Sequence, residues 1–155
     1  MSLANANQSS EPVLIVGAGP AGLAIAKCLK DQGLSVRVVD RFGLAGGAYR
    51  RMYPNLTLAS PASYLSLPGT DLNPSTEYIR ADQFASYLEQ YAAQHQISVE
   101  TGNLVDLVSG TSGVQAIFAT GHKITFPAVV VAPGMTDSPA LPVIQGLELR
   151  RKGLG

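Results

Sequence analysis

The stretch Val13-Leu14-Ile15-Val16-Gly17-Ala18-Gly19-Pro20-Ala21-Gly22 decides the fold, and a mostly apolar segment follows it as far as residue 30. An apolar run, a G-x-G-x-x-G turn and a helix-forming segment together predict a buried strand that leads through a tight turn into a helix. Gly17 permits the turn, Gly19 lets the backbone approach a ligand, and Gly22 lets the helix pack close to the strand. Free N–H groups and the positive end of the helix dipole then face an anion, so this stretch predicts a pyrophosphate-binding turn.

The residues after this turn place an acidic side chain where a dinucleotide site needs one. Gly33 is expected to end the helix, and a second apolar run, Val36–Val39, leads to Asp40, roughly 20 residues after the turn. A carboxylate there accepts hydrogen bonds from a ribose diol and repels a 2′-phosphate, so the site is expected to reject NADP. The alternative is an ordinary strand-turn-helix with a surface Asp. The presence of the strand, turn, helix and acid at the order and spacing of a dinucleotide site disfavours this alternative.

Length, composition and charge limit the classes to which the protein can belong. The chain has 155 residues, 46% hydrophobic and 14% charged, which predicts one globular domain. Eleven basic residues balance eleven acidic ones, so nothing points to nucleic acid or to an anionic membrane. No apolar run approaches the ~20 residues that span a bilayer. Residues 1–11 are polar and are expected to be a disordered leader, not a signal peptide, which makes the cytoplasm the expected compartment.

Cysteine and histidine usage argues against redox and metal chemistry by side chains. The single cysteine, Cys28, is expected to be buried in the first helix, and no C-x-x-C pair supports a dithiol reductase. His95 and His122 lack a second ligand at metal spacing and are expected to be exposed polar residues, so no metal site is expected.

The middle of the chain is expected to combine a long loop with one amphipathic helix. Residues 41–78 are rich in glycine and proline without a sustained helical period, which is typical of a functional or mobile segment. Within it, Gly46-Gly47 permits close approach to a ligand, and Arg50 and Arg51 could equally contact a phosphate or serve as surface charges. Residues 77–94 have apolar side chains at helical spacing and are expected to pack on the sheet.

The remaining strands complete the expected topology. Ile97–Glu100 is expected to be a third parallel strand. Three short β patterns at 104–108, 114–119 and 123–126 predict a β-meander where a crossover helix would be usual. Ala128–Ala132 is apolar throughout, which predicts a buried central strand. The strand is expected to end in Pro133-Gly134, at the same sheet edge as the glycine turn. Ligands of open α/β sheets bind along that edge.

Six motifs in this order resemble a known family. They are GAGPAGL (17–23), VVDR (38–41), GGAYRRMY (46–53), LTLASP (56–61), LSLPG (65–69) and VVVAPG (129–134). Together they resemble the N-terminal FAD-binding part of flavin-dependent monooxygenases, in particular the bacterial branch often labelled flavoproteins of cation transport. The resemblance covers residues 12–148. It implies an α/β, Rossmann-like FAD/NAD(P)-binding three-layer ββα sandwich, in which a parallel sheet carries a β-meander crossover.

The resemblance also implies a set of cofactor-binding residues. They are Gly17, Gly19, Pro20, Ala21 and Gly22 at the pyrophosphate, Asp40 at the adenosine ribose, Arg41 beside the adenine, Gly47 and Tyr49 along the flavin side, Val105 with its backbone at the adenine, and Ala132 and Gly134 beside the FAD. Two positions depart from the family pattern. Tyr49 stands where many relatives carry Trp, and Pro133 replaces a Thr and removes an N–H group. No residue is assigned as a catalytic acid or base.

The function implied by the resemblance is that of an oxidoreductase in which NADPH reduces FAD and the flavin oxygenates a small organic substrate. The sequence holds no second G-x-G-x-x-G turn for NADPH, and residues 149–155 read as a tail. The chain would then be a fragment, with a missing C-terminal half or a second copy supplying the rest. A non-catalytic FAD- or ADP-binding module is the alternative. A plain NAD dehydrogenase domain is disfavoured by the long loop and the meander.

Overall fold

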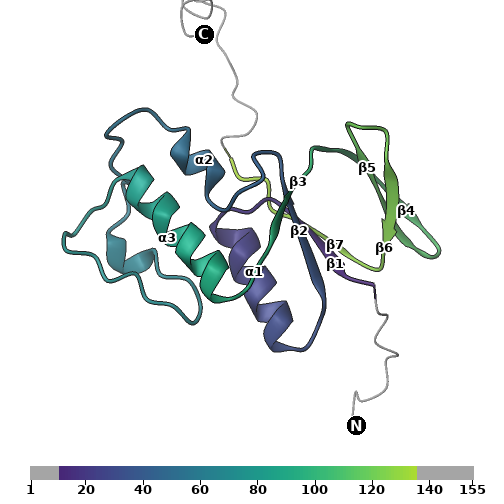
Figure 1. The fold of residues 1–155 in the computed structure, drawn as a ribbon, viewed down its shortest axis with the longest axis horizontal. Helices are drawn as coiled ribbons and strands as arrows, with labels where there is room; N and C mark the ends of the chain where they lie inside the picture. Colours follow the sequence, from purple (N-terminus) through teal and green to yellow (C-terminus); the bar gives the residue numbers. More distant parts are fainter. Residues whose placement is uncertain (1–10, 136–155) are drawn as a thin grey trace, which may run out of the picture.

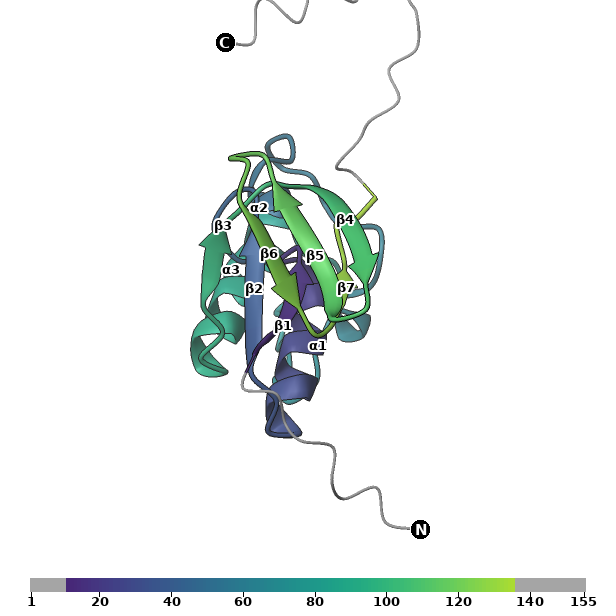
Figure 2. The same ribbon diagram turned by 90° about the vertical axis from the view of Figure 1, so that its right-hand side faces the viewer.

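The computed structural model describes residues 11–135, which form three layers (Figures 1 and 2). The elements in chain order are β1 (Val13–Val16), α1 (Pro20–Asp31), β2 (Val36–Asp40), α2 (Gly47–Arg50), a 3-10 turn (Ala62–Tyr64), α3 (Ala81–Gln94), β3 (Val99–Thr101), β4 (Leu104–Gly110), β5 (Gly113–Phe118), β6 (Lys123–Phe126) and β7 (Val129–Val131). The expected leader and tail lie outside the described residues, apart from Glu11.

A parallel four-stranded sheet forms the middle layer, in the order β3-β2-β1-β7. Helices α1 and α3 cover one face and the antiparallel sheet β4-β5-β6 covers the other, as Figure 1 shows from left to right. This arrangement confirms the expected ββα sandwich, and the meander stands where a crossover helix would be usual. Because β1, β2 and β7 run parallel, their carboxyl ends meet at one edge of the sheet.

Helix α1 forms as its sequence predicts. Pro20 occupies the first helical position, where its missing N–H group costs nothing. At the other end, Gly33 adopts φ +76°, and its N–H group donates to the Lys30 carbonyl over 2.9 Å. This left-handed residue ends the helix as expected. The Cys28 thiol, however, is exposed, which contradicts the expected burial. The helix buries the face that carries Gly22, Leu23 and Ala26, and position 28 lies on another face.

Helix α3 supplies much of the core between the helices and the parallel sheet. Its apolar stripe is buried as expected, with Phe84, Leu88 and Tyr91 at most 2% exposed. The helix begins at Ala81 and not at residue 77. The backbone of Arg80 is extended and forms an isolated bridge with Thr57, which holds the preceding residues in the loop.

The long loop after β2 is anchored to α3 by tyrosine side chains. The Tyr87 hydroxyl donates to the Thr70 carbonyl over 2.7 Å, and the Tyr91 hydroxyl donates to the Pro68 carbonyl over 2.8 Å. His95 is half-buried and not exposed, because its Nε2 lies 2.8 Å from the Thr70 hydroxyl and its ring packs 4.5 Å from that of Tyr91. His122 is exposed as expected.

A second core lies between the parallel sheet and the meander, where Leu14 and Val39 pack against Ala116, Phe118 and Phe126. Strand β7 differs from the expected central strand. It pairs with β1 and, within residues 11–135, with no strand on its outer side. As a result it forms an edge of the sheet, and Val131 is 55% exposed. No helix in this part of the chain is long and apolar enough to cross a membrane.

Candidate functional site

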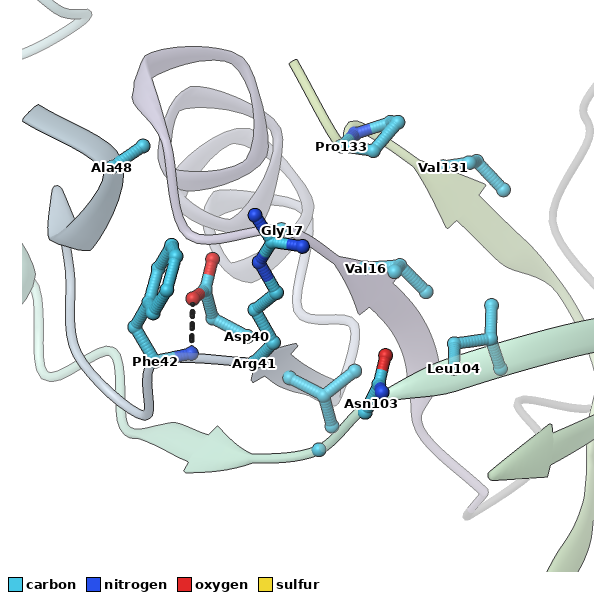
Figure 3. A pocket seen from close by; sticks show the side chains of 12 residues that line it. Val16, Gly17, Asp40, Arg41, Phe42, Ala48, Asn103, Leu104, Val131 and Pro133 are labelled. Carbon is cyan, nitrogen blue, oxygen red and sulfur yellow. Dashed lines mark hydrogen bonds between the residues drawn. The ribbon is translucent and has the colours of Figure 1, made fainter. Parts of the chain in front are cut away.

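Two adjoining cavities lie where the parallel strands end. The first, of about 200 Å³, is lined by Val16, Gly17, Val39, Asp40, Arg41, Phe42, Ala48, Gly102, Asn103, Leu104, Val131 and Pro133 (Figure 3). The second, of about 290 Å³, is lined by Gly17, Gly19, Pro20, Ala21, Asp40, Gly47, Ala48, Tyr49, Met52, Ala132, Pro133, Gly134 and Met135. Both include Gly17, Asp40, Ala48 and Pro133, so they adjoin, and the two cavities together are called the channel below.

The glycine turn is shaped by two close approaches of backbone. Gly17 adopts φ +102°, and a Cβ there would lie 2.1 Å from the carbonyl oxygen of Ala132, the residue after β7. A Cβ on Gly22 would lie 1.9 Å from the carbonyl oxygen of Gly17. Only glycine fits at these two positions. A Cβ on Gly19, by contrast, would meet no atom within 4 Å, and Gly19 lines the second cavity. The space above Gly19 is therefore open to a ligand.

The start of α1 favours a negatively charged ligand at this turn. Gly19 is the N-cap, and no side chain caps the helix. The first N–H groups of a helix have no acceptor within it, and the helix dipole places partial positive charge there. A diphosphate beside Gly19 would accept hydrogen bonds from these N–H groups and bring negative charge to the positive end of the dipole. The turn therefore fits the pyrophosphate of a dinucleotide.

The carboxylate of Asp40 is held at the corner between the two cavities. Its Oδ2 accepts a hydrogen bond from the Ala18 N–H group over 2.9 Å. Its Oδ1 accepts one from the Phe42 N–H group over 2.8 Å, which Figure 3 marks with a dashed line. Each carboxylate oxygen can accept a further hydrogen bond. The side chain is only partly buried and lines both cavities, so it can receive two hydroxyl groups of a ribose.

A short segment from the long loop completes the wall of the second cavity. Gly46 adopts φ +69°, and its N–H group donates to the Ala18 carbonyl over 2.9 Å, which ties α2 to the glycine turn. A Cβ on Gly47 would lie 2.8 Å from the Cβ of Phe42. The Tyr49 ring packs edge-on to that of Phe84 at 5.0 Å, and burial raises the pKa of the Tyr49 phenol.

The arginines near the channel take different places. Arg41 lines the first cavity, and its guanidinium lies 4.8 Å from the centre of the Phe42 ring. The Arg51 guanidinium lies at the same distance from that ring, but Arg51 lines neither cavity. Arg50 pairs with Glu89 and also lies outside both. Of the three, Arg41 is therefore the one placed to contact a ligand in the channel.

The structure brings together most of the residues named from the sequence. Gly22 lies beneath the turn and lines neither cavity, because it contacts the backbone of Gly17. Val105 is 59% exposed and also lines neither, whereas Asn103 and Leu104 line the first cavity. Sequence reasoning missed Phe42, Ala48, Met52, Asn103 and Leu104. The available signal was the Gly102-Asn103 turn, which follows the carboxyl end of β3.

Comparisons with known proteins agree with this geometry. A family model described as pyridine nucleotide-disulphide oxidoreductase matches residues 14–152. "Indole-3-pyruvate monooxygenase YUCCA1" of Oryza sativa subsp. japonica is 34% identical over 143 residues, covering 87% of this chain and 34% of its own length. "Uncharacterized oxidoreductase CzcO-like" of Geobacillus kaustophilus is 29% identical over 131 residues, covering 84% of this chain and 38% of its own length. The chain thus spans about a third of the length of these curated relatives.

A solved structure shows the same arrangement. The flavin-containing monooxygenase from Stenotrophomonas maltophilia superposes with a TM-score of 0.78 at 26% identity, over 89% of this chain and 42% of the other. The resemblance to flavin-dependent monooxygenases that the sequence motifs indicate is thereby confirmed. The glycine turn, the carboxylate at the end of β2 and the family match lead to one conclusion: this chain belongs to the pyridine nucleotide-disulphide oxidoreductase family.

Proposed function

We propose that this chain is the FAD-binding part of an NADPH-dependent flavin monooxygenase. The observation that carries the proposal is the position of Asp40, whose carboxylate is held by two backbone N–H groups at the corner of a channel that starts at the glycine turn. The channel offers a place for a ribose, a diphosphate and an aromatic ring in succession. A structural neighbour named as a flavin-containing monooxygenase supports FAD as the dinucleotide.

Different residues of the channel would bind different parts of the cofactor. The first N–H groups of α1, above Gly19, would bind the pyrophosphate, and Asp40 would accept hydrogen bonds from the adenosine ribose. Arg41 and Leu104 line the first cavity, where the adenine would lie. Gly47 and Tyr49 would face the flavin side, in the second cavity. The bound flavin supplies the electron transfer and oxygen activation, while these residues bind and orient it.

NADPH would bind to a part of the protein outside this chain. Asp40 repels a 2′-phosphate, so the channel itself suits FAD and not NADPH. The sequence holds no second glycine turn of the dinucleotide type. A solved neighbour is described as a steroid monooxygenase bound to NADP, and this chain covers 29% of it. We assign residues 12–148 to the FAD-binding domain, and we place the protein in the cytoplasm, which cell fractionation would test.

A second candidate function is a non-catalytic module that binds FAD or its ADP half. The observation that favours it is that the groups gathered at the channel, the glycine turn and Asp40, are suited to binding a dinucleotide. Such a module would keep the glycine turn and Asp40 without reducing the flavin.

An absorbance spectrum of the purified chain with added FAD, recorded before and after NADPH, tests these functions. We expect a flavin spectrum that persists after gel filtration, and a much weaker one for Asp40→Ala. Tyr78→Phe is a matched control, because Tyr78 is exposed and lines neither cavity. Bleaching of the flavin by NADPH would show that this chain also reduces its cofactor. A colourless protein that binds ADP but not FAD would favour the module, and binding of neither would refute both functions.

A further inference from the structure

The Phe42 ring lies between the end of β2 and the start of α2, and it forms part of the wall of the first cavity (Figure 3). Two guanidinium groups contact this ring. Those of Arg41 and Arg51 each lie 4.8 Å from its centre, a distance at which a cation is attracted to the face of an aromatic ring. Arg41 lines the first cavity, whereas Arg51 lines neither cavity of the channel. One ring therefore contacts one cation inside the site and one cation outside it.

The position of Phe42 is fixed by its backbone and by α2. Its N–H group donates to Oδ1 of Asp40 over 2.8 Å. A Cβ on Gly47 would lie 2.8 Å from the Cβ of Phe42 and 3.1 Å from its Cδ2, so the side chain packs directly against the backbone at the start of α2. The Gly46 N–H group donates to the Ala18 carbonyl and holds α2 on the glycine turn. Phe42 is partly buried by these contacts, so its ring is a fixed surface on which a longer side chain can rest.

The side chain of Arg41 gains order from this surface. Arg41 is exposed, and an exposed arginine samples many rotamers, so a ligand that orders it pays in conformational entropy. Contact with a fixed ring removes part of that cost before the ligand arrives. Because the guanidinium is planar, one of its faces can rest on Phe42 while the other remains available to a flat base in the first cavity. The contact between Arg41 and Phe42 thus prepares the site for an adenine.

We propose that Phe42 is a positioning residue for the adenosine end of the cofactor, and that it acts through the guanidinium of Arg41. This role rests on the proposed function, in which the adenine lies in the first cavity. It differs from direct contact with the ligand, because Phe42 should matter little to binding once the Arg41 guanidinium is removed. Arg51 contacts the same ring at the same distance but lies outside the cavity, so its removal should matter little to the adenine.

Calorimetric titration of the 155-residue chain with ADP tests this role in a double-mutant cycle. Phe42→Leu keeps an apolar side chain against Gly47 but has no aromatic face, and it should weaken ADP about threefold, the effect of one exposed cation–π contact. Arg41→Gln should weaken ADP about fivefold. If Phe42 acts through Arg41, the double variant should also lose about fivefold and not the roughly fifteenfold of two independent effects. Phe42→Tyr keeps the aromatic face and should restore the affinity. Arg51→Gln is the matched control and should stay within about twofold, because salt screens an exposed charge.

A measurement without ligand tests the contact itself. A proton that lies over the face of an aromatic ring is shielded by the ring current. The NMR signal of the Arg41 Nε–H group, assigned by its loss in Arg41→Gln, should therefore move downfield in Phe42→Leu and stay in place in Phe42→Tyr. Thermal melts show whether each variant is folded at the temperature of the titration. Phe42→Met replaces Phe42→Leu if the latter is unfolded, because it also lacks an aromatic face.

The outcomes separate this inference from the proposed function. Full ADP affinity in Phe42→Leu, tighter binding in that variant, or an Arg41 signal that does not respond to it would overturn the positioning role while ADP and FAD still bind. Independent losses in the double variant would also overturn it, because Phe42 would then contact the ligand itself. A chain that binds neither ADP nor FAD would refute the proposed function, and Phe42 would have no cofactor to position.

Discussion

The replacement Gly22→Ala tests whether close backbone packing shapes the glycine turn. The added Cβ would lie 1.9 Å from the Gly17 carbonyl oxygen, and real contacts of this kind are not shorter than 3.0 Å, so the helix must move by at least 1.1 Å (3.0 − 1.9). Such overpacking costs about 3 kcal/mol, and the higher helix propensity of alanine returns about 1 kcal/mol. We therefore expect a net loss of about 2 kcal/mol, or about 6 °C in the melting temperature of a chain of this size.

The matched control is Gly19→Ala, three positions earlier in the same turn. Gly19 has φ −81°, and its added Cβ would meet no atom within 4 Å. The loss of stability should stay below about 1 kcal/mol, since alanine is only a poorer N-cap than glycine. The methyl group would, however, enter the second cavity, where the pyrophosphate is proposed to lie. FAD affinity should fall about tenfold or more, through the usual cost of overpacking.

Thermal unfolding followed by circular dichroism and FAD titration followed by flavin fluorescence measure the two effects separately. The expected pattern is a less stable protein for Gly22→Ala and a stable protein with weak FAD binding for Gly19→Ala. An unchanged melting temperature for Gly22→Ala would show that the turn is not packed as described. FAD binding by Gly19→Ala at the affinity of the unmodified chain would place the diphosphate elsewhere.

Three further predictions follow from single side chains. Asp40→Asn keeps at most one of the acceptors for the Ala18 and Phe42 N–H groups and loses the charge, so FAD affinity should fall about tenfold in a fluorescence titration; unchanged affinity would remove Asp40 from the site. Burial raises the pKa of Tyr91 to about 12, so the folded state holds this proton more tightly than the unfolded state. The resulting stability is complete below pH 10 and is lost as the pH rises towards 12; chemical denaturation at pH 9 and 11.5 should show this loss, and Tyr91→Phe should reduce it. Gln96 adopts φ +52° after the end of α3, so Gln96→Gly should stabilise the protein by about 1 kcal/mol in a thermal melt, and a lower melting temperature would contradict that reasoning.

The parts of the fold that could be predicted from sequence depend on short-range patterns. The glycine turn and Asp40 follow from residue types at fixed spacing, because strand, turn and helix are consecutive in the chain. The stripe on α3 follows from helical periodicity. The exposure of Cys28 and the edge position of β7 depend on which elements pack against them, and a single sequence does not specify this.

The missed residues of the first cavity show a second limit, which is register. That the Val105 backbone meets the adenine stays a prediction, while the pairing of β4 with β5 is shifted between Leu104 and Asp106. Such a shift changes which side chains of a strand point to each face, and here Asn103 and Leu104 line the cavity while Val105 is exposed. Phe42 and Ala48 were missed for another reason. They reach the channel because the loop after β2 folds back on the glycine turn, as the bond from Gly46 to Ala18 shows.

The two halves of the channel differ in how firmly this chain holds their polar contacts in place before a ligand binds. The first cavity is bounded by strand ends, by the β3–β4 turn and by Asp40, which backbone bonds hold in place without a ligand. The second ends at Met135, which is 94% exposed. A half whose contacts are already in place should provide most of the binding free energy, because little ordering remains to be done when the ligand arrives. ADP should therefore bind this chain within about tenfold of FAD and compete with it in a calorimetric titration. FAD that binds more than a hundredfold more tightly than ADP would show that the flavin half dominates.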